Sequence, residues 1–275
     1  MKRLGRFLRP VFTAAGLRPP APPDAEAPVV LTEEALGQAL LRLDGGLGLF
    51  RLAHLLDAIR QAPRTRSLLS IGSGLGLQEA FIAVTHPGLE VVGVDLRTPR
   101  LAGTLPNLTL IRGDFFDAAV RSRLPVADFV CTVECLEHIE DDEAVVALMV
   151  SKLAPGGRLY LQVPFASEAE LTDPALCRRE LEEHGHVRPG YSPERLLFLA
   201  GRQGLTVESV AAAYRFPLQP LVAAGVSTIP RDVLLPRWRE ILELIETDVS
   251  DGLAANRTEA TAIKLLARRE APLAG

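Results

Sequence analysis

The sequence has few cysteines, few aromatic residues and no long apolar run, and each shortage excludes a class of protein. Its 275 residues include three cysteines, Cys131, Cys135 and Cys177, without a Cys-x-x-C pair. An odd count with no paired spacing excludes a disulfide framework and favours a reducing compartment. No apolar run reaches the roughly 18 residues that span a membrane. We therefore expect a cytoplasmic protein.

The net charge of −4 is unevenly distributed along the chain. Five basic residues precede the first acid, Asp24, so the rest of the chain is more acidic than the whole. An acidic body argues against wide contact with nucleic acid. The basic segment, residues 1–17, has apolar residues at helical spacing. That pattern fits either peripheral contact with an anionic membrane or an arm docked on its own domain.

The proline-rich run at residues 19–28 indicates a linker. We therefore divide the chain into a basic arm with its linker, residues 1–28, and one domain, residues 29–275. Hydrophobic residues make up 48% of the chain, which is ample material for a large core.

Strand-like and helix-like segments alternate from residue 67 onward, after two leucine-rich helices within residues 31–62. Alternation of this kind predicts an α/β fold, a parallel sheet with helices on both faces. A helical insertion at residues 217–252, with one helix around 238–247, precedes the last strand. The predicted strands are 67–71, 90–95, 108–112, 128–133, 158–163, 206–212 and 260–267, and the helices between them are 77–85, 142–153 and 192–203.

The first predicted strand leads into a glycine loop, Gly72-Ser-Gly74-Leu-Gly76. The next strand ends at Asp95, 19 residues beyond Gly76, close to the roughly 20 expected of a ribose-binding carboxylate. Small residues let backbone amides approach a bound cofactor, and the acid can hold a ribose. The G-x-G-x-G spacing differs from the G-x-G-x-x-G of nicotinamide-dependent oxidoreductases, which argues against that class.

A cluster of acids and histidines follows the fourth predicted strand. If the chain turns helical there, Glu134, Glu137 and His138 share one helix face. A further histidine, His184 or His186, follows the fifth strand. Two carboxylates and one or two imidazoles can hold Mg²⁺, Mn²⁺ or Zn²⁺. The same residues can instead provide a base without a metal, or only shape the fold.

Together these motifs resemble the class I S-adenosylmethionine (SAM)-dependent methyltransferases, over roughly residues 67–268. The glycine loop is similar to the cofactor loop of that family, and the Pro-Gly-Gly of residues 155–157 is similar to the turn entering its fifth strand. The resemblance implies a Rossmann-like, seven-stranded mixed sheet with an antiparallel last strand. It also implies that SAM is bound by Gly72, Gly74, Gly76, Asp95, Asp114, Phe115 and Val133.

One position departs from the family pattern. The family usually has an acid two residues before the first glycine, where it helps to hold the methionine amino group, and Ser70 occupies that position here. A hydroxyl can bond an ammonium group, but without the charge-assisted contribution. Either the affinity for SAM is modest or another group compensates.

The E-x-x-E-H segment resembles two branches of the family, the ubiquinone-biosynthesis O-methyltransferases and the small-RNA 3′-end 2′-O-methyltransferases. This resemblance implies a divalent ion, Mg²⁺ or Mn²⁺, that lowers the pKa of an acceptor hydroxyl. His186 is preferred to His184 because the run after it resembles the segment after the distal ligand. The implied metal ligands are Glu134, Glu137, His138 and His186.

The acceptor is not identified by any motif, but the segments that select it in this fold have few aromatic residues, which favours a small or lipid-like molecule. Arg188 and Tyr191 lie in a loop where acceptors of the family often enter. We predict SAM-dependent O-methylation of a small organic acceptor, with His138 and Glu137 as catalytic residues and a divalent ion as a possible aid. A catalytically silent SAM-binding scaffold and an RNA 3′-end 2′-O-methyltransferase are the alternatives.

Overall fold

The computed structural model describes residues 27–215, 218–246 and 260–271. The basic segment 1–17, with its predicted membrane contact, lies outside the described residues, as do parts of the predicted insertion. Within the described residues, no helix is long and apolar enough to cross a membrane.

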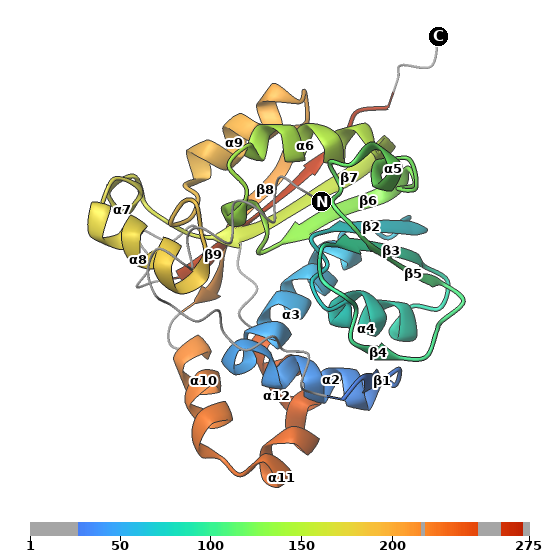
Figure 1. Ribbon diagram of the computed structural model, residues 1–275, viewed down its shortest axis with the longest axis vertical. Helices are drawn as coiled ribbons and strands as arrows, with labels where there is room; N and C mark the ends of the chain where they lie inside the picture. The colour runs from blue at the N-terminus through green and yellow to red at the C-terminus, as the bar shows by residue number, and fades with distance from the viewer. Residues whose placement is uncertain (1–26, 216–217, 247–259, 272–275) are drawn as a thin grey trace.

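The centre of the molecule is a seven-stranded sheet with the order β5-β3-β2-β6-β7-β9-β8 (Figure 1). Strand β9 is antiparallel to both neighbours, and the other pairs are parallel. The predicted Rossmann-like mixed sheet with an antiparallel last strand is confirmed. The strands are β2 (Ser67–Ile71), β3 (Glu90–Asp95), β5 (Leu108–Arg112), β6 (Ala127–Val133), β7 (Leu153–Pro164), β8 (Thr206–Arg215) and β9 (Ala260–Arg268).

Helices cover both faces of the sheet, so the strands are apolar on both sides. On one face, Leu68 and Phe129 pack beneath α2 (Glu33–Arg42), α3 (Leu47–Arg60) and α4 (Leu77–Thr85). On the other, Leu69 and Val130 pack beneath α6 (Asp142–Ser151) and α9 (Pro193–Arg202). Figure 1 shows these two helical layers on opposite sides of the strands.

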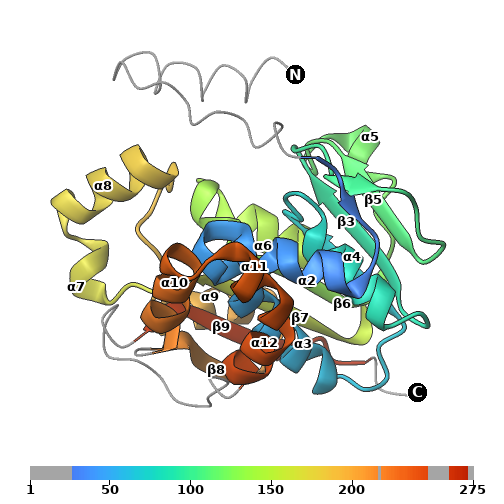
Figure 2. The same cartoon turned by 90° about the horizontal axis from the view of Figure 1, so that it is seen from below.

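The insertion before the last strand packs on the N-terminal helices (Figure 2). Trp238 is 1% exposed, its ring meets Phe81 edge-to-face at 5.7 Å between centroids, and its indole N–H donates to Glu34 at 2.8 Å. The sequence predicted one helix here, whereas the structure has four short segments. They are α10 (Leu218–Thr228), α11 (Arg231–Leu234), η4 (Leu235–Arg237) and α12 (Trp238–Glu246).

Several short elements escaped the sequence analysis. The longest is α8 (Pro174–His184), in which only Leu176 and Glu180 are buried, so its apolar periodicity is weak. The end signals are clear, however, because Asp173 caps a helix with proline in its first turn and Gly185 ends it with φ 72°. The others are β1 (Val29–Val30), η2 (Leu43–Gly46), β4 (Leu101–Ala102), α5 (Ala118–Arg121), η3 (Leu136–His138) and α7 (Glu168–Leu171).

Candidate active site at the carboxyl edge of the sheet

The glycine loop joins β2 to α4 at the edge where the parallel strands end. Gly72 has φ 79°, and a side chain there would overlap Cys135, so the position requires glycine for space as well as conformation. Gly74 has φ 58°, and a Cβ built on it would meet no atom within 4 Å. The backbone at Gly74 therefore borders open space that a ligand can enter.

Asp95, at the end of β3, is held against this loop. One carboxylate oxygen accepts a hydrogen bond from the Gly74 N–H at 2.8 Å, and the other accepts from the Arg97 N–H at 2.7 Å. Each oxygen keeps a further lone pair. The structure thus brings the loop and the acid together, in the arrangement that the sequence spacing indicates for ribose binding.

Asp114 follows β5, and its carboxylate accepts from the Phe116 N–H at 2.9 Å. Phe115, expected beside a bound adenine, is 8% exposed and packs into the core beneath α6. Phe116 is 38% exposed, with its ring centroid 4.9 Å from that of Phe115. Val133 is half-buried at the end of β6. The exposed ring beside Asp114 is therefore Phe116, which the sequence analysis did not single out.

Ser70 and Glu79 form a buried polar pair beneath the loop, and each is 3% exposed. Burial raises the pKa of the Glu79 carboxyl to about 7, hydrogen bonding to Ser70 opposes this, and Asp95 adds to it. The Oε2 atom of Glu79 has no hydrogen-bond partner among the described residues. Sequence reasoning missed Glu79, although an acid between the apolar residues of a helix that starts at a cofactor loop is an informative signal.

The chain does not turn helical at Glu134. Its φ is 52°, a left-handed backbone conformation that is unfavourable for residues other than glycine. Its backbone N–H donates to the Gln162 carbonyl at 2.9 Å. A single 3₁₀ turn, η3, begins only at Leu136. The common helix face expected for Glu134, Glu137 and His138 is therefore not formed. Burial raises the pKa of Tyr214 on β8, and the Glu134 carboxylate adds to this rise. Burial opposes the charge of Arg51 on α3, but the Glu134 carboxylate helps to raise its pKa.

Glu137, His138 and His186 do converge, because each offers a ligand atom within 4.8 Å of the others. The rings of His138 and His186 meet edge-on, 4.8 Å between centroids. Glu134 is not in this group. His184 is 55% exposed and lies outside it, with its ring 5.3 Å from that of His186. Of the two distal histidines considered, the structure brings His186 to the cluster.

Burial sets the protonation of this three-residue cluster. It raises the pKa of Glu137 well above its usual range, and the nearby Glu134 adds to the rise. It lowers the pKa of His138, and it lowers that of His186 to about 4, with His138 contributing. Both imidazoles are therefore neutral at pH 7, with a lone pair for a metal or a proton. His186 Nδ1 lies 2.9 Å from Glu180, which leaves its Nε2 for the cluster.

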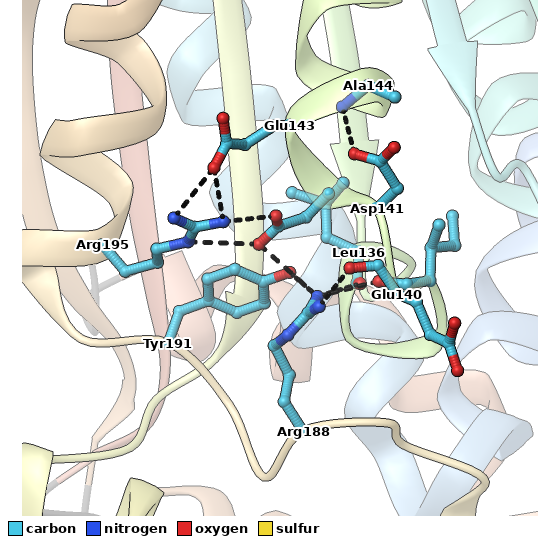
Figure 3. Close-up of polar contacts among 10 residues, drawn as sticks. Leu136, Glu140, Asp141, Glu143, Ala144, Arg188, Tyr191 and Arg195 are labelled. Carbon is cyan, nitrogen blue, oxygen red and sulfur yellow. Dashed lines mark hydrogen bonds and ion pairs between the residues drawn. The ribbon is translucent and has the colours of Figure 1, made fainter.

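Arg188 joins the two loops that carry these histidines (Figure 3). Its guanidinium donates to three backbone carbonyls, those of Leu136 at 3.1 Å, Ile139 at 2.9 Å and Glu140 at 2.8 Å. It also donates to the hydroxyl of Tyr191 at 2.7 Å, and that side chain is fully buried. The sequence analysis considered Arg188 and Tyr191 for acceptor entry, but the structure uses them to hold the loop after β6 against residues 185–191.

Comparison with known proteins gives consistent results. A family model described as a methyltransferase domain matches residues 49–210. The chain is 29% identical to a trans-aconitate 2-methyltransferase of Methylobacterium radiotolerans over 104 residues, 38% of this chain and 39% of that protein. It is 28% identical to a ubiquinone biosynthesis O-methyltransferase of Xanthomonas axonopodis over 164 residues, 55% of this chain and 67% of that protein. The chain spans only 34%, 39% and 40% of the first three curated relatives.

Among solved structures, the fold is similar to that of a Galdieria sulphuraria protein provisionally named a sarcosine dimethylglycine methyltransferase. The TM-score is 0.54 at 15% identity, over 81% of this chain and 86% of that one. At this identity the likeness concerns the fold alone.

Proposed function

This chain belongs to the methyltransferase-domain family, and we propose that it transfers the methyl group of SAM to an oxygen atom of a small organic acceptor. The observation that carries the proposal is the convergence of Glu137, His138 and His186 at the sheet edge that also holds the glycine loop. The curated relative named for ubiquinone biosynthesis is an O-methyltransferase, which supports the choice of oxygen.

The cofactor site fits SAM on three observations. The backbone at Gly74 borders open space, the Asp95 carboxylate is fixed beside it, and a buried oxygen of Glu79 has no partner among the described residues. SAM supplies a methyl group already activated on a sulfonium. We assign Gly72, Gly74 and Gly76 to the close backbone approach, Asp95 to the ribose hydroxyls and Asp114 to the adenine. We assign the exposed ring of Phe116 and the half-buried Val133 to the adenine side, whereas Phe115 is buried in the core.

When no metal ion is bound, the role of His138 is to take the acceptor proton. Its side chain is 43% exposed, and partial desolvation lowers its pKa, so the imidazole is neutral at pH 7. His138 Nδ1 lies 3.3 Å from the Gly185 carbonyl, so an N–H at Nδ1 leaves the lone pair on Nε2. Nε2 is also the nitrogen nearer to Glu137, at 3.9 Å. A neutral, oriented imidazole of this kind is suited to general-base catalysis.

The same cluster fits Mg²⁺ or Mn²⁺. Glu137 is buried with one oxygen lacking a hydrogen-bond partner among the described residues, and a cation there would favour its ionised form. Glu180 bonds the outer nitrogen of His186, which is the usual support for a metal-binding histidine. We propose Glu137, His138 and His186 as protein ligands, with Glu134 outside this set. The Nε2 lone pair of His138 then binds the ion, so His138 is not the base while an ion is bound. A bound ion would lower the pKa of an acceptor hydroxyl.

Calorimetric titration tests this function. We expect S-adenosylhomocysteine to bind the purified chain, and Mn²⁺ to produce heat that EDTA abolishes. A Glu137→Gln/His138→Ala variant should lose the Mn²⁺ signal and keep S-adenosylhomocysteine binding, whereas His184→Ala, the exposed histidine nearby, should keep both.

Each other outcome points elsewhere. S-adenosylhomocysteine binding without Mn²⁺ heat would leave His138 as a metal-free base. Turnover that survives His138→Ala with both ligands bound would remove it from catalysis. S-adenosylhomocysteine binding without turnover of any acceptor would favour the silent SAM-binding scaffold, and failure to bind it under any condition would contradict both the enzyme and that scaffold. Salt-sensitive RNA affinity would favour an RNA acceptor.

A further inference from the structure

Glu79 is an acid in a place where an acid is costly. It is the third residue of α4, it is 3% exposed, and buried apolar residues flank it on the same helix. Burying an unpaired carboxylate is unfavourable unless something compensates. One of its oxygens has no hydrogen-bond partner among the described residues, so the fold alone does not account for this acid.

The surroundings of Glu79 come from three neighbouring strands. Hydrogen bonding to Ser70 of β2 lowers the pKa of the Glu79 carboxyl, and the charge of Asp95 at the end of β3 raises it. The charge of Glu79 in turn adds to the raised pKa of Cys131 on β6, which burial causes in the first place. Glu79 and Asp95 thus place two acids beside one glycine loop. A cation bound between them would relieve their repulsion and supply the missing hydrogen bond.

By the resemblance given in the sequence analysis, an acid that holds the methionine amino group would be expected at the position of Ser70, on the strand. Here the strand carries a hydroxyl and the helix beside it carries the carboxylate, and hydrogen bonding to that hydroxyl opposes the rise in the pKa of the carboxyl. We propose that Glu79 supplies the carboxylate that holds the α-amino group of SAM, in place of an acid at position 70. This assignment rests on the proposed function, because it requires SAM as the ligand.

The arrangement has a consequence for pH dependence. Burial raises the pKa of Glu79 to about 7, so the free protein near neutrality holds a mixture of the acid and the carboxylate. An ammonium group binds the carboxylate, so affinity should increase as the pH rises from 6 to 8. Of the groups that face Glu79, Cys131 stays a thiol over this range because burial raises its pKa strongly. Within the part of the chain that the structure describes, Ser70 and Asp95 also affect the pKa of Glu79.

The experiment compares two ligands that differ in one group, S-adenosylhomocysteine and its deamino analogue, which has hydrogen in place of the α-amino group. We expect Glu79→Gln to weaken S-adenosylhomocysteine binding about 10- to 100-fold and to leave the analogue unchanged. We also expect Ser70→Asp to restore the affinity of a Glu79→Ser variant, because the pair exchanges its roles. Equal loss for both ligands, or no loss, would overturn the assignment.

The wild-type protein provides a test that does not depend on a variant folding. S-adenosylhomocysteine affinity should rise between pH 6 and 8 while that of the deamino analogue stays flat, and a parallel dependence for the two ligands would contradict the role of Glu79. Absence of any S-adenosylhomocysteine binding would instead contradict the proposed function. The two failures are therefore distinguishable.

Discussion

Two glycines of one loop serve different purposes, and alanine substitutions should separate them. Both have positive φ, so alanine costs about 1–2 kcal/mol of strain at either position. At Gly72 the new methyl also overlaps Cys135, which adds about 1–3 kcal/mol. We expect Gly72→Ala to lower the free energy of unfolding more than Gly74→Ala, as measured by urea titration.

For S-adenosylhomocysteine binding we expect the reverse order, with Gly74→Ala more affected than Gly72→Ala. The methyl of Gly74→Ala enters the open space beside Asp95, where we place the cofactor. We expect this variant to lose most of its S-adenosylhomocysteine affinity while it stays folded, and calorimetry on the two variants measures this directly. If Gly74→Ala bound S-adenosylhomocysteine normally, the open space would not be the cofactor site.

The sequence predicted some of these residues well and others not at all. Asp95 was found because a chain spacing of about 20 residues separates a ribose acid from its loop in many folds. Glu79 was missed because its meaning depends on the side chain it touches, Ser70, which lies on another element. The predicted helix at Glu134 was wrong because Glu134 itself, directly after β6, has a left-handed backbone conformation that a helix cannot include.

At the scale of elements, the histidine cluster depends on how two loops are fastened. Arg188 donates three hydrogen bonds to carbonyls of the loop after β6 and one to the hydroxyl of Tyr191. The single ammonium group of a lysine has fewer donors and lacks the planar guanidinium geometry, so it cannot replace all four. We expect Arg188→Lys to lower the free energy of unfolding by about 1.5–3 kcal/mol. It should also weaken Mn²⁺ binding, because His138 and His186 would no longer be held together.

The control for this prediction is the cofactor loop, which stands on other elements. Calorimetry should show unchanged S-adenosylhomocysteine affinity in Arg188→Lys, and Arg178→Lys, at an exposed position on α8, should alter neither ligand. Unchanged Mn²⁺ affinity in Arg188→Lys would mean that the cluster is preorganised without this bridge.

Elements were predictable from sequence where burial imposes a pattern. The inner strand β2 is buried along almost its whole length, so its apolar run is conspicuous in the sequence. The predicted bounds of β2, β3 and β5 agree with the structure, although β5 is an edge strand with one buried residue. Helix α8 buries two of its residues and leaves almost no such pattern. The glycines at 156–157 were expected to form a turn before the fifth strand. They lie within the bounds of β7, but Gly156 has φ 79°, and the pairing with β6 passes from Leu153 directly to Arg158. The glycines therefore form an irregular turn just before the regular part of the strand, and they are held there by hydrogen bonds to Arg269.

At the scale of the whole molecule, the insertion and the sheet share one core. Trp238 on α12 packs on Phe81 of α4 and, through Glu34, on α2, so the insertion completes the apolar layer that covers one face of the sheet. A shared core predicts cooperative unfolding. Trp238 is the single tryptophan of the chain, so its fluorescence reports on the insertion alone. We expect its urea transition to coincide with that of the far-ultraviolet circular dichroism.

A variant at the contact makes this prediction stricter. Phe81→Leu removes the edge-to-face ring contact and part of the buried volume, at a cost of about 1–2 kcal/mol. If the insertion and the sheet unfold together, both transitions should move to lower urea by the same amount. If the insertion opens first, only the fluorescence transition should move, and α10 to α12 would then be a separate unit that opens without unfolding the sheet.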